Sequence, residues 1–270
     1  MEAREVTILV ATCARQKNLE SFFRSIEKWE YNKNPKIEIL VIENSPAVEM
    51  FQITDELCKK FGARALHQPQ SGKPAALNLG VANANAPLIA FTDDDIEMVN
   101  ERWVSRMAAN FKNDPNLGYV SGQVLLNNTN STPHSHRWEK KGGLSKGLVD
   151  MDWCQEFLTS RRFIISPWPF HKICAGANCM IRKDVLLKVG TFREILGEDG
   201  PVGHGYTLEI GYRIAKAGYG LRYDSSAVVV HNHPSTPDAI VQKLYRYGKG
   251  DTAYALFIFL RYRDWRYLWW

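Results

Sequence analysis

Three consecutive carboxylates follow an apolar run in the stretch IAFTDDDIEM, and these are the residues best suited to chemistry. Asp93, Asp94 and Asp95 repel one another, and burial would raise their pKa values unless cations or hydrogen-bond donors offset the charge. Oxygen ligands spaced i and i+2 suit Mg²⁺ or Mn²⁺, which keep open coordination positions for phosphate oxygens. A turn with helix-capping aspartates is the alternative interpretation of the triplet taken alone.

The chain around the triplet alternates buried strands with helices. Apolar runs predict strands over residues 6–12, 36–44, 63–68, 87–93, 118–126 and 221–233. Helical spacing of apolar residues predicts helices over 18–29, 48–62, 73–85, 101–113 and 208–220, and a strand that feeds a helix over 174–190. Such strands between helices indicate an α/β fold with a mostly parallel sheet, whose ligands bind at the carboxyl ends of the strands. The triplet lies at such an end.

Composition narrows the class of protein. The chain has 270 residues, of which 45% are hydrophobic, and its net charge of +5 favours anionic ligands or an anionic membrane surface. We find no basic run that indicates nucleic acid, and the five cysteines show no CxxC pair typical of zinc or redox sites. The N-terminus does not resemble a signal peptide, and no apolar stretch reaches the ~20 residues of a spanning helix. We therefore expect a cytoplasmic protein.

The segment GKPAALNLGVANANAPLIAFTDDD closely resembles the nucleotide-sugar half of the family-2 glycosyltransferases, which have the Rossmann-like GT-A fold. The resemblance spans roughly residues 5–250. It implies a metal-dependent hexosyltransferase that moves a sugar from a nucleotide-diphosphate donor, expected to be UDP-linked, to a saccharide or lipid-linked acceptor. It also implies a catalytic domain over 1–238, with a nucleotide-sugar half (1–126) and an acceptor half (127–238), followed by a helical tail (239–270).

The same resemblance assigns most of the site residues. The opening strand and turn would contact the base, Glu43 would reach the base or ribose, and the segment after residue 72 would flank the diphosphate. Small residues of the stretch AGAN would let a sugar approach closely. The residues implied to bind the nucleotide sugar are Ala11, Thr12, Arg15, Glu43, Lys73, Asn78, Asp93, Asp94, Gly176 and Asn178.

A divalent ion, Mn²⁺ or Mg²⁺, is the cofactor that the resemblance implies. The aspartates match the family's DXD motif, so Asp95 would bind the ion while Asp93 or Asp94 contacts the ribose. His231 ends a predicted strand, where GT-A enzymes often have a further metal ligand, and His233 is the second candidate. The alternative for His231 is a hydrogen-bonded histidine at a strand end.

The catalytic base departs from the family pattern. Family-2 enzymes usually carry Glu-Asp before the helix that here reads LEIGYRIAKAGY, whereas Tyr206 and Thr207 occupy those positions. We expect Glu209, or Asp199 beside Glu198, to serve instead, although Glu209 could also be a first-turn charge that favours the helix dipole. A retaining mechanism that needs no enzymic base is a third possibility, and an inactive sugar-nucleotide-binding relative is a fourth.

Two further features bear on class and location. A nucleotidyltransferase is an alternative enzyme, but it would be expected to carry a Gly-rich N-terminal phosphate loop, and VATCARQKN has no glycine.

Residues 241–270 mix basic and aromatic side chains, which predicts peripheral contact with the cytoplasmic face of a membrane. Packing on the catalytic domain or in a homodimer is the alternative. The polar, irregular segment 127–172 is long enough to favour a functional role.

Overall fold

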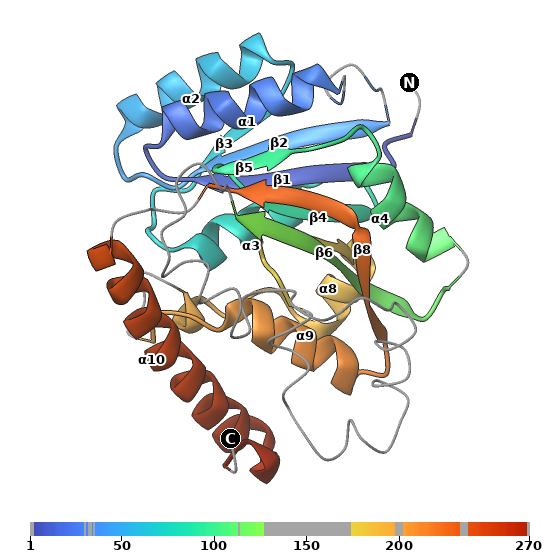
Figure 1. Ribbon diagram of the computed structural model, residues 1–270, viewed down its shortest axis with the longest axis vertical. Coiled ribbons are helices and arrows are strands. Elements are labelled where there is room, and N and C mark those ends of the chain that lie inside the picture. The colour runs from blue at the N-terminus through green and yellow to red at the C-terminus, as the bar shows by residue number, and fades with distance from the viewer. Residues whose placement is uncertain are drawn as a thin grey trace.

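The structure is a computed structural model in which one mixed sheet is covered by helices on both faces (Figure 1). It describes residues 3–29, 31, 34, 36–112, 114–126, 174–197, 202–232 and 237–268. The strands are β1 (Val6–Thr12), β2 (Ile37–Glu43), β3 (Arg64–His67), β4 (Leu88–Asp93), β5 (Ile96–Met98), β6 (Leu117–Leu126), β7 (Asn178–Arg182) and β8 (Gly220–His231). The helices are α1 (Gln16–Lys28), α2 (Val48–Lys60), α3 (Lys73–Asn83), α4 (Trp103–Lys112), α8 (Lys183–Val189), α9 (Tyr206–Lys216) and α10 (Pro237–Tyr262), with 3-10 turns η3 (Glu194–Leu196) and η4 (Trp265–Leu268).

The strand order is β3-β2-β1-β4-β7-β6-β8-β5. Strands β3, β2, β1 and β4 pair in parallel, and so do β6 and β8, which confirms the predicted α/β class. Two features were not predicted: β7 runs antiparallel to both β4 and β6, and the short β5 adds an antiparallel edge beside β8. Because β7 lies between β4 and β6, the two predicted halves of the catalytic domain contribute strands to one sheet. Their division into halves stays a prediction.

Side chains alternate between the two faces of the sheet along each strand, and each face is covered by its own apolar layer. In β1, Ile8 and Val10 face a layer that includes α1 and α4, whereas Leu9 faces a layer that includes α3, α9 and α10. All three side chains are fully buried. This pattern is what a parallel sheet covered on both faces requires, since successive side chains point to opposite faces.

Strand register brings the carboxyl ends of several strands to one edge of the sheet. Thr12 at the end of β1 lies opposite Glu43 at the end of β2, and Ala11 lies opposite Asp93. Because β7 runs in the opposite direction, its first residue, Asn178, pairs with Thr92 at the same edge. We call this edge, with the residues that follow each strand, the carboxyl edge.

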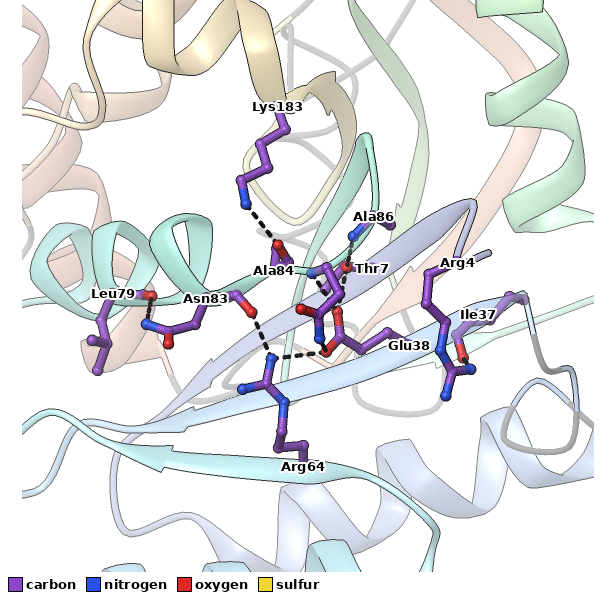
Figure 2. A network of polar contacts seen from close by, with 11 residues as sticks. Arg4, Thr7, Ile37, Glu38, Arg64, Leu79, Asn83, Ala84, Ala86 and Lys183 are labelled. Carbon is purple, nitrogen blue, oxygen red and sulfur yellow. Dashed lines mark hydrogen bonds and ion pairs between the residues drawn. The ribbon is translucent and has the colours of Figure 1, made fainter. Parts of the chain in front are cut away.

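The opposite edge is held by a buried polar network (Figure 2). One carboxylate, Glu38 of β2, accepts hydrogen bonds from Thr7 of β1 (2.6 Å), Arg64 of β3 (2.8 Å) and both nitrogens of Asn85 (2.8 and 2.7 Å). Arg64 also donates to the carbonyl of Asn83 at 2.6 Å. Burial raises the pKa of Glu38, but these donors outweigh it and leave the pKa below its usual value. The network therefore joins three strands to the end of α3.

We predict that Glu38→Ala lowers the free energy of unfolding by about 2 kcal/mol, because it removes the buried acceptor of Thr7, Asn85 and the part-exposed Arg64. Since the folded-state pKa of Glu38 is lowered, its contribution is present above the unfolded pKa of about 4.3 and is lost as the pH falls through the folded value. Urea unfolding near neutral pH measures the loss. Glu5→Ala, which removes an exposed ion pair with Lys36, is the control, and equal midpoints for the two variants would contradict the prediction.

Candidate functional site

The acidic triplet lies at the carboxyl edge, and each carboxylate has a cationic partner. Nζ of Lys73, at the start of α3, lies 2.5 Å from Asp93. The guanidinium of Arg15, just before α1, lies 2.9 Å from Asp94 and 2.8 Å from Asp95. The loop after β1 and the start of α3 therefore supply the positive charge that three adjacent carboxylates need.

Asp94 and Asp95 share Arg15 but differ in acidity. Burial, which leaves the Asp94 side chain 2% exposed, raises its pKa to about 6 even though Thr12 donates a hydrogen bond to it at 2.7 Å. Burial also raises the pKa of Asp95, but His231 and Arg15 outweigh it and hold the pKa well below the usual value. The difference in pKa follows from His231, the second partner of Asp95. Asp95 therefore stays ionised to a lower pH than Asp94 does.

Asp93, Asp95 and His231 form a group able to hold a metal ion. One ligand atom from each lies within 4.8 Å of the others, and Nε2 of His231 is 2.9 Å from Oδ1 of Asp95. Adjacent ligands of an octahedral ion with bonds of about 2.1 Å are separated by a similar distance. The two carboxylate oxygens suit Mn²⁺ or Mg²⁺, and the imidazole nitrogen suits Mn²⁺. The predicted ligands are thus brought together, and Asp93 joins them.

Glu43 is fully buried at the end of β2, and both of its oxygens are used inside the protein. Oε1 accepts hydrogen bonds from the backbone nitrogens of Ala14 and Ser45, each at 2.9 Å. Oε2 accepts one from Thr54 of α2 at 2.6 Å. Glu43 therefore shapes the loop that carries Arg15, and its predicted contact with the nucleotide stays a prediction.

Asn44 is a positioning residue that the sequence analysis missed. Its side chain donates to the carbonyls of Gln68 (2.8 Å) and Gln70 (2.7 Å) and accepts from the nitrogen of Gly72 (3.0 Å). These bonds fix the segment that leads into α3, so they place Lys73. The sequence did carry a signal for Asn44, which is an amide side chain directly after a predicted buried strand.

Two asparagines predicted to bind the nucleotide sugar form hydrogen bonds within the protein itself. Asn78 of α3 exchanges hydrogen bonds with the backbone of Phe192, at 3.0 and 2.8 Å. Asn178 is fully buried: it donates to the carbonyls of Gln123 and Ala227 and accepts from the indole of Trp103. Both side chains hold together elements near the site, and their contact with the nucleotide sugar stays a prediction.

Gly176 lies where the AGAN stretch meets the start of α9. A Cβ on Gly176 would come within 2.6 Å of Cγ2 of Thr207, so glycine is required for this close approach. Ala11, opposite Asp93, is the remaining predicted contact at this edge. The position where the family carries its base therefore packs against the stretch predicted to line the sugar site.

Glu209 is fully buried in an ion pair. Arg213 lies 2.7 Å away, one helical turn along α9, and Tyr262 of α10 donates a hydrogen bond at 2.9 Å. Arg213 also donates to the carbonyls of Val189, Gly190 and Thr191. This arrangement favours a structural role for Glu209, and its role as base stays a prediction.

Several predicted features lie outside the described residues. The second base candidate, Asp199, and its neighbour Glu198 are among them, as are His233 and the irregular segment 127–172.

The sequence model described as Glycosyl transferase family 2 matches residues 7–190. This match covers more than half of the chain, including the triplet and the loops that support it. The chain belongs to glycosyl transferase family 2. The predicted family and the prediction of a glycosyltransferase are thereby confirmed, whereas the hexosyltransferase class and the metal dependence stay predictions.

Relatives and solved structures agree with this membership. The chain is 23% identical to Glycosyltransferase AglE of Haloferax volcanii over 252 residues, covering 91% of this chain and 72% of AglE. It is 22% identical to the Pre-mycofactocin glycosyltransferase of Mycobacterium tuberculosis, covering 85% of this chain but only 43% of that protein. The mannosyltransferase PcManGT of Pyrobaculum calidifontis, solved with GDP-Man and Mn2+, superposes with a TM-score of 0.63 at 16% identity, covering 94% of this chain and 64% of its own.

These likenesses show that the family-2 chain has the GT-A fold. They do not favour the nucleotidyltransferase or the inactive relative that the sequence left open. The chain spans less than two thirds of the mannosyltransferase and less than half of the mycobacterial enzyme. The sugar, the acceptor and the role of each site residue are therefore matters for proposal.

We predict that Glu209→Gln lowers the free energy of unfolding by about 3 kcal/mol, because it leaves buried Arg213 without its counter-charge. Sugar transfer by the folded variant should stay within a few-fold of the wild-type rate. Thermal unfolding and turnover, both measured where the variant is folded, test the two expectations. A rate loss of about 10²–10⁴-fold with unchanged stability would instead identify Glu209 as the base.

Proposed function

We propose that this chain moves a sugar from a nucleotide-diphosphate donor to a saccharide or lipid-linked acceptor in a metal-dependent reaction. The observation that carries the proposal is the grouping of Asp93, Asp95 and His231 at the carboxyl edge, with Lys73 and Arg15 beside them. A divalent ion and two cationic side chains in one place suit the binding of a diphosphate. We expect a UDP-linked sugar, and GDP-Man, found with Mn2+ in the mannosyltransferase, is the alternative.

A divalent ion bound to Asp95 and His231 would supply Lewis-acid stabilisation of the leaving diphosphate. Two basic side chains of the protein can also bind the negative charge of the diphosphate. Arg15 is about half exposed and pairs with Asp94 and Asp95, so it can turn towards phosphate oxygens once those carboxylates have another partner. Lys73, at the N-terminus of α3, adds to the positive end of that helix dipole.

The outer face of α10 supports a lipid-linked acceptor. Its exposed apolar side chains follow helical spacing from Val241 and Tyr245 to Leu256 and Leu260. The exposed apolar residues of η4, Trp265 and Leu268, continue this surface. The exposed basic residues nearby are Arg246, Lys249, Arg261 and Arg263. Such a surface suits the headgroup region of an anionic membrane, where apolar side chains enter the lipid and basic groups meet phosphates.

Contact with a membrane surface differs from insertion of a helix across the bilayer. Within the ranges that the structure describes, no helix combines the length and the apolar character needed to cross a bilayer. The contact that we propose is along the side of α10.

We predict that Asp95→Asn abolishes Mn²⁺-dependent binding of the donor and lowers turnover by more than about 100-fold, since a metal ligand is lost. Titration calorimetry with UDP-glucose, UDP-N-acetylglucosamine and GDP-mannose, with and without MnCl₂, measures binding. Released nucleoside diphosphate, as opposed to pyrophosphate, identifies sugar transfer.

Glu97→Gln is the matched control for that experiment, because Glu97 is an exposed carboxylate two residues further along the chain. It should bind and turn over the donor like the wild type. Metal-dependent turnover by Asp95→Asn at the wild-type rate would refute the proposed site.

We predict that the double variant Leu256→Glu, Leu260→Glu no longer sediments with phosphatidylcholine vesicles that contain phosphatidylglycerol, because two charges enter the apolar stripe of α10. Wild-type binding should weaken as salt is added, since screening reduces the attraction of the basic groups. Leu187→Glu, at an exposed leucine of α8, is the control and should still bind. Wild-type protein that does not sediment with these vesicles would contradict the proposed membrane contact.

A further inference from the structure

The inner face of α10 carries a carboxylate. Residues that recur every three or four positions along this face pack on the rest of the protein, and Tyr254, Ala255 and Ile258 are buried in the apolar layer beneath the sheet. Asp251 lies one turn before them in the same stripe and is half-buried. Helical spacing therefore directs an acidic side chain towards the body of the protein, where an apolar one would be expected.

The turn of α10 that carries Asp251 lies beside the start of α9. Gly205, the residue before α9, has a positive φ of 129°, and a Cβ on it would lie 3.0 Å from Cβ of Tyr254 and 3.8 Å from the carbonyl oxygen of Gly250. A Cβ on Gly250 would lie 2.3 Å from Cβ of His204. Residues 250–254, which include Asp251, are thus pressed against the backbone that leads into α9.

The start of α9 connects this point to the acidic triplet. Thr207, two residues after Gly205, touches Gly176, and the strand after Gly176 pairs with Thr92, the residue before the triplet. Thr207 also stands where the family carries its catalytic carboxylate. Asp251 therefore lies next to the segment that would hold the base, and it comes from a different helix.

The surroundings of Asp251 suit a proton acceptor. Burial raises its pKa to about 6, closer to neutral pH than that of an ordinary aspartate. A base with a pKa near the working pH is the more effective one. Placing a carboxylate at a core-facing position costs stability, and carboxylates whose pKa is raised by burial are frequent in functional sites.

We propose that Asp251 is the general base of the sugar transfer and takes the place of the carboxylate missing at Thr207. The inference rests on the proposed function. The acceptor oxygen forms a bond to the anomeric carbon, and its proton passes to the Asp251 carboxylate. The bond from that carbon to the phosphate oxygen breaks, and its electron pair leaves with the nucleoside diphosphate. The anomeric configuration is inverted in the product.

Donor hydrolysis tests this role, because water then serves as the acceptor. With Mn²⁺ and whichever of the three nucleotide sugars binds the wild type, Asp251→Asn should keep the donor Kd within about two-fold and lose about 10²–10⁴-fold in rate. Asp251→Glu should recover part of the rate. Sodium azide should restore nucleoside diphosphate release to Asp251→Ala and yield a glycosyl azide, because azide attacks without a proton to lose. A merely structural aspartate would not produce azide rescue.

Asp238→Asn is the matched control, since Asp238 is an exposed carboxylate in the first turn of the same helix. Hydrolysis by folded Asp251→Asn within three-fold of the wild type, or a product of retained configuration, would overturn the inference and leave the proposed function standing. Wild-type protein that binds none of the nucleotide sugars with Mn²⁺ would instead overturn the proposed function itself. Circular dichroism confirms that each variant is folded.

Discussion

The balance of charge at the end of β4 is the constraint on which the site depends. Three adjacent carboxylates at the edge of a buried sheet are tolerable only because two cationic side chains and an imidazole from separate elements contact them. Arg15 comes from the loop after β1, Lys73 from the start of α3 and His231 from the end of β8. The parallel strands bring these parts of the chain to one edge of the sheet. The charge balance of the site therefore depends on the topology of the sheet.

A layer of buried polar side chains holds those cations in place. Glu43 fixes the loop that carries Arg15, and Asn44 fixes the segment that carries Lys73. Asn178 joins the start of β7 to β6 and β8, which sets the position of the stretch around Gly176. Supporting groups of this kind orient the residues that contact ligands and are part of the site's precision.

Much of this arrangement could be predicted from the sequence, and the rest depends on distant contacts. Continuous apolar runs predicted β1, β2 and β4, and the triplet and His231 were predicted as partners. The direction of β7 and the three-residue β5 are set by pairing with remote strands, which no local pattern encodes. Glu209 resembles a first-turn glutamate in sequence, but its partner Tyr262 lies on another helix. The role proposed for Asp251 likewise depends on how α10 packs on α9.

The central claim is that Asp95 and His231 share one divalent ion at the carboxyl edge. Anomalous diffraction from a crystal grown with MnCl₂ and a nucleotide sugar tests it most directly. The account predicts a manganese peak between these two side chains, with the diphosphate of the donor against it. A bound nucleotide sugar with no peak there, or a peak at some other group of residues, would contradict the account.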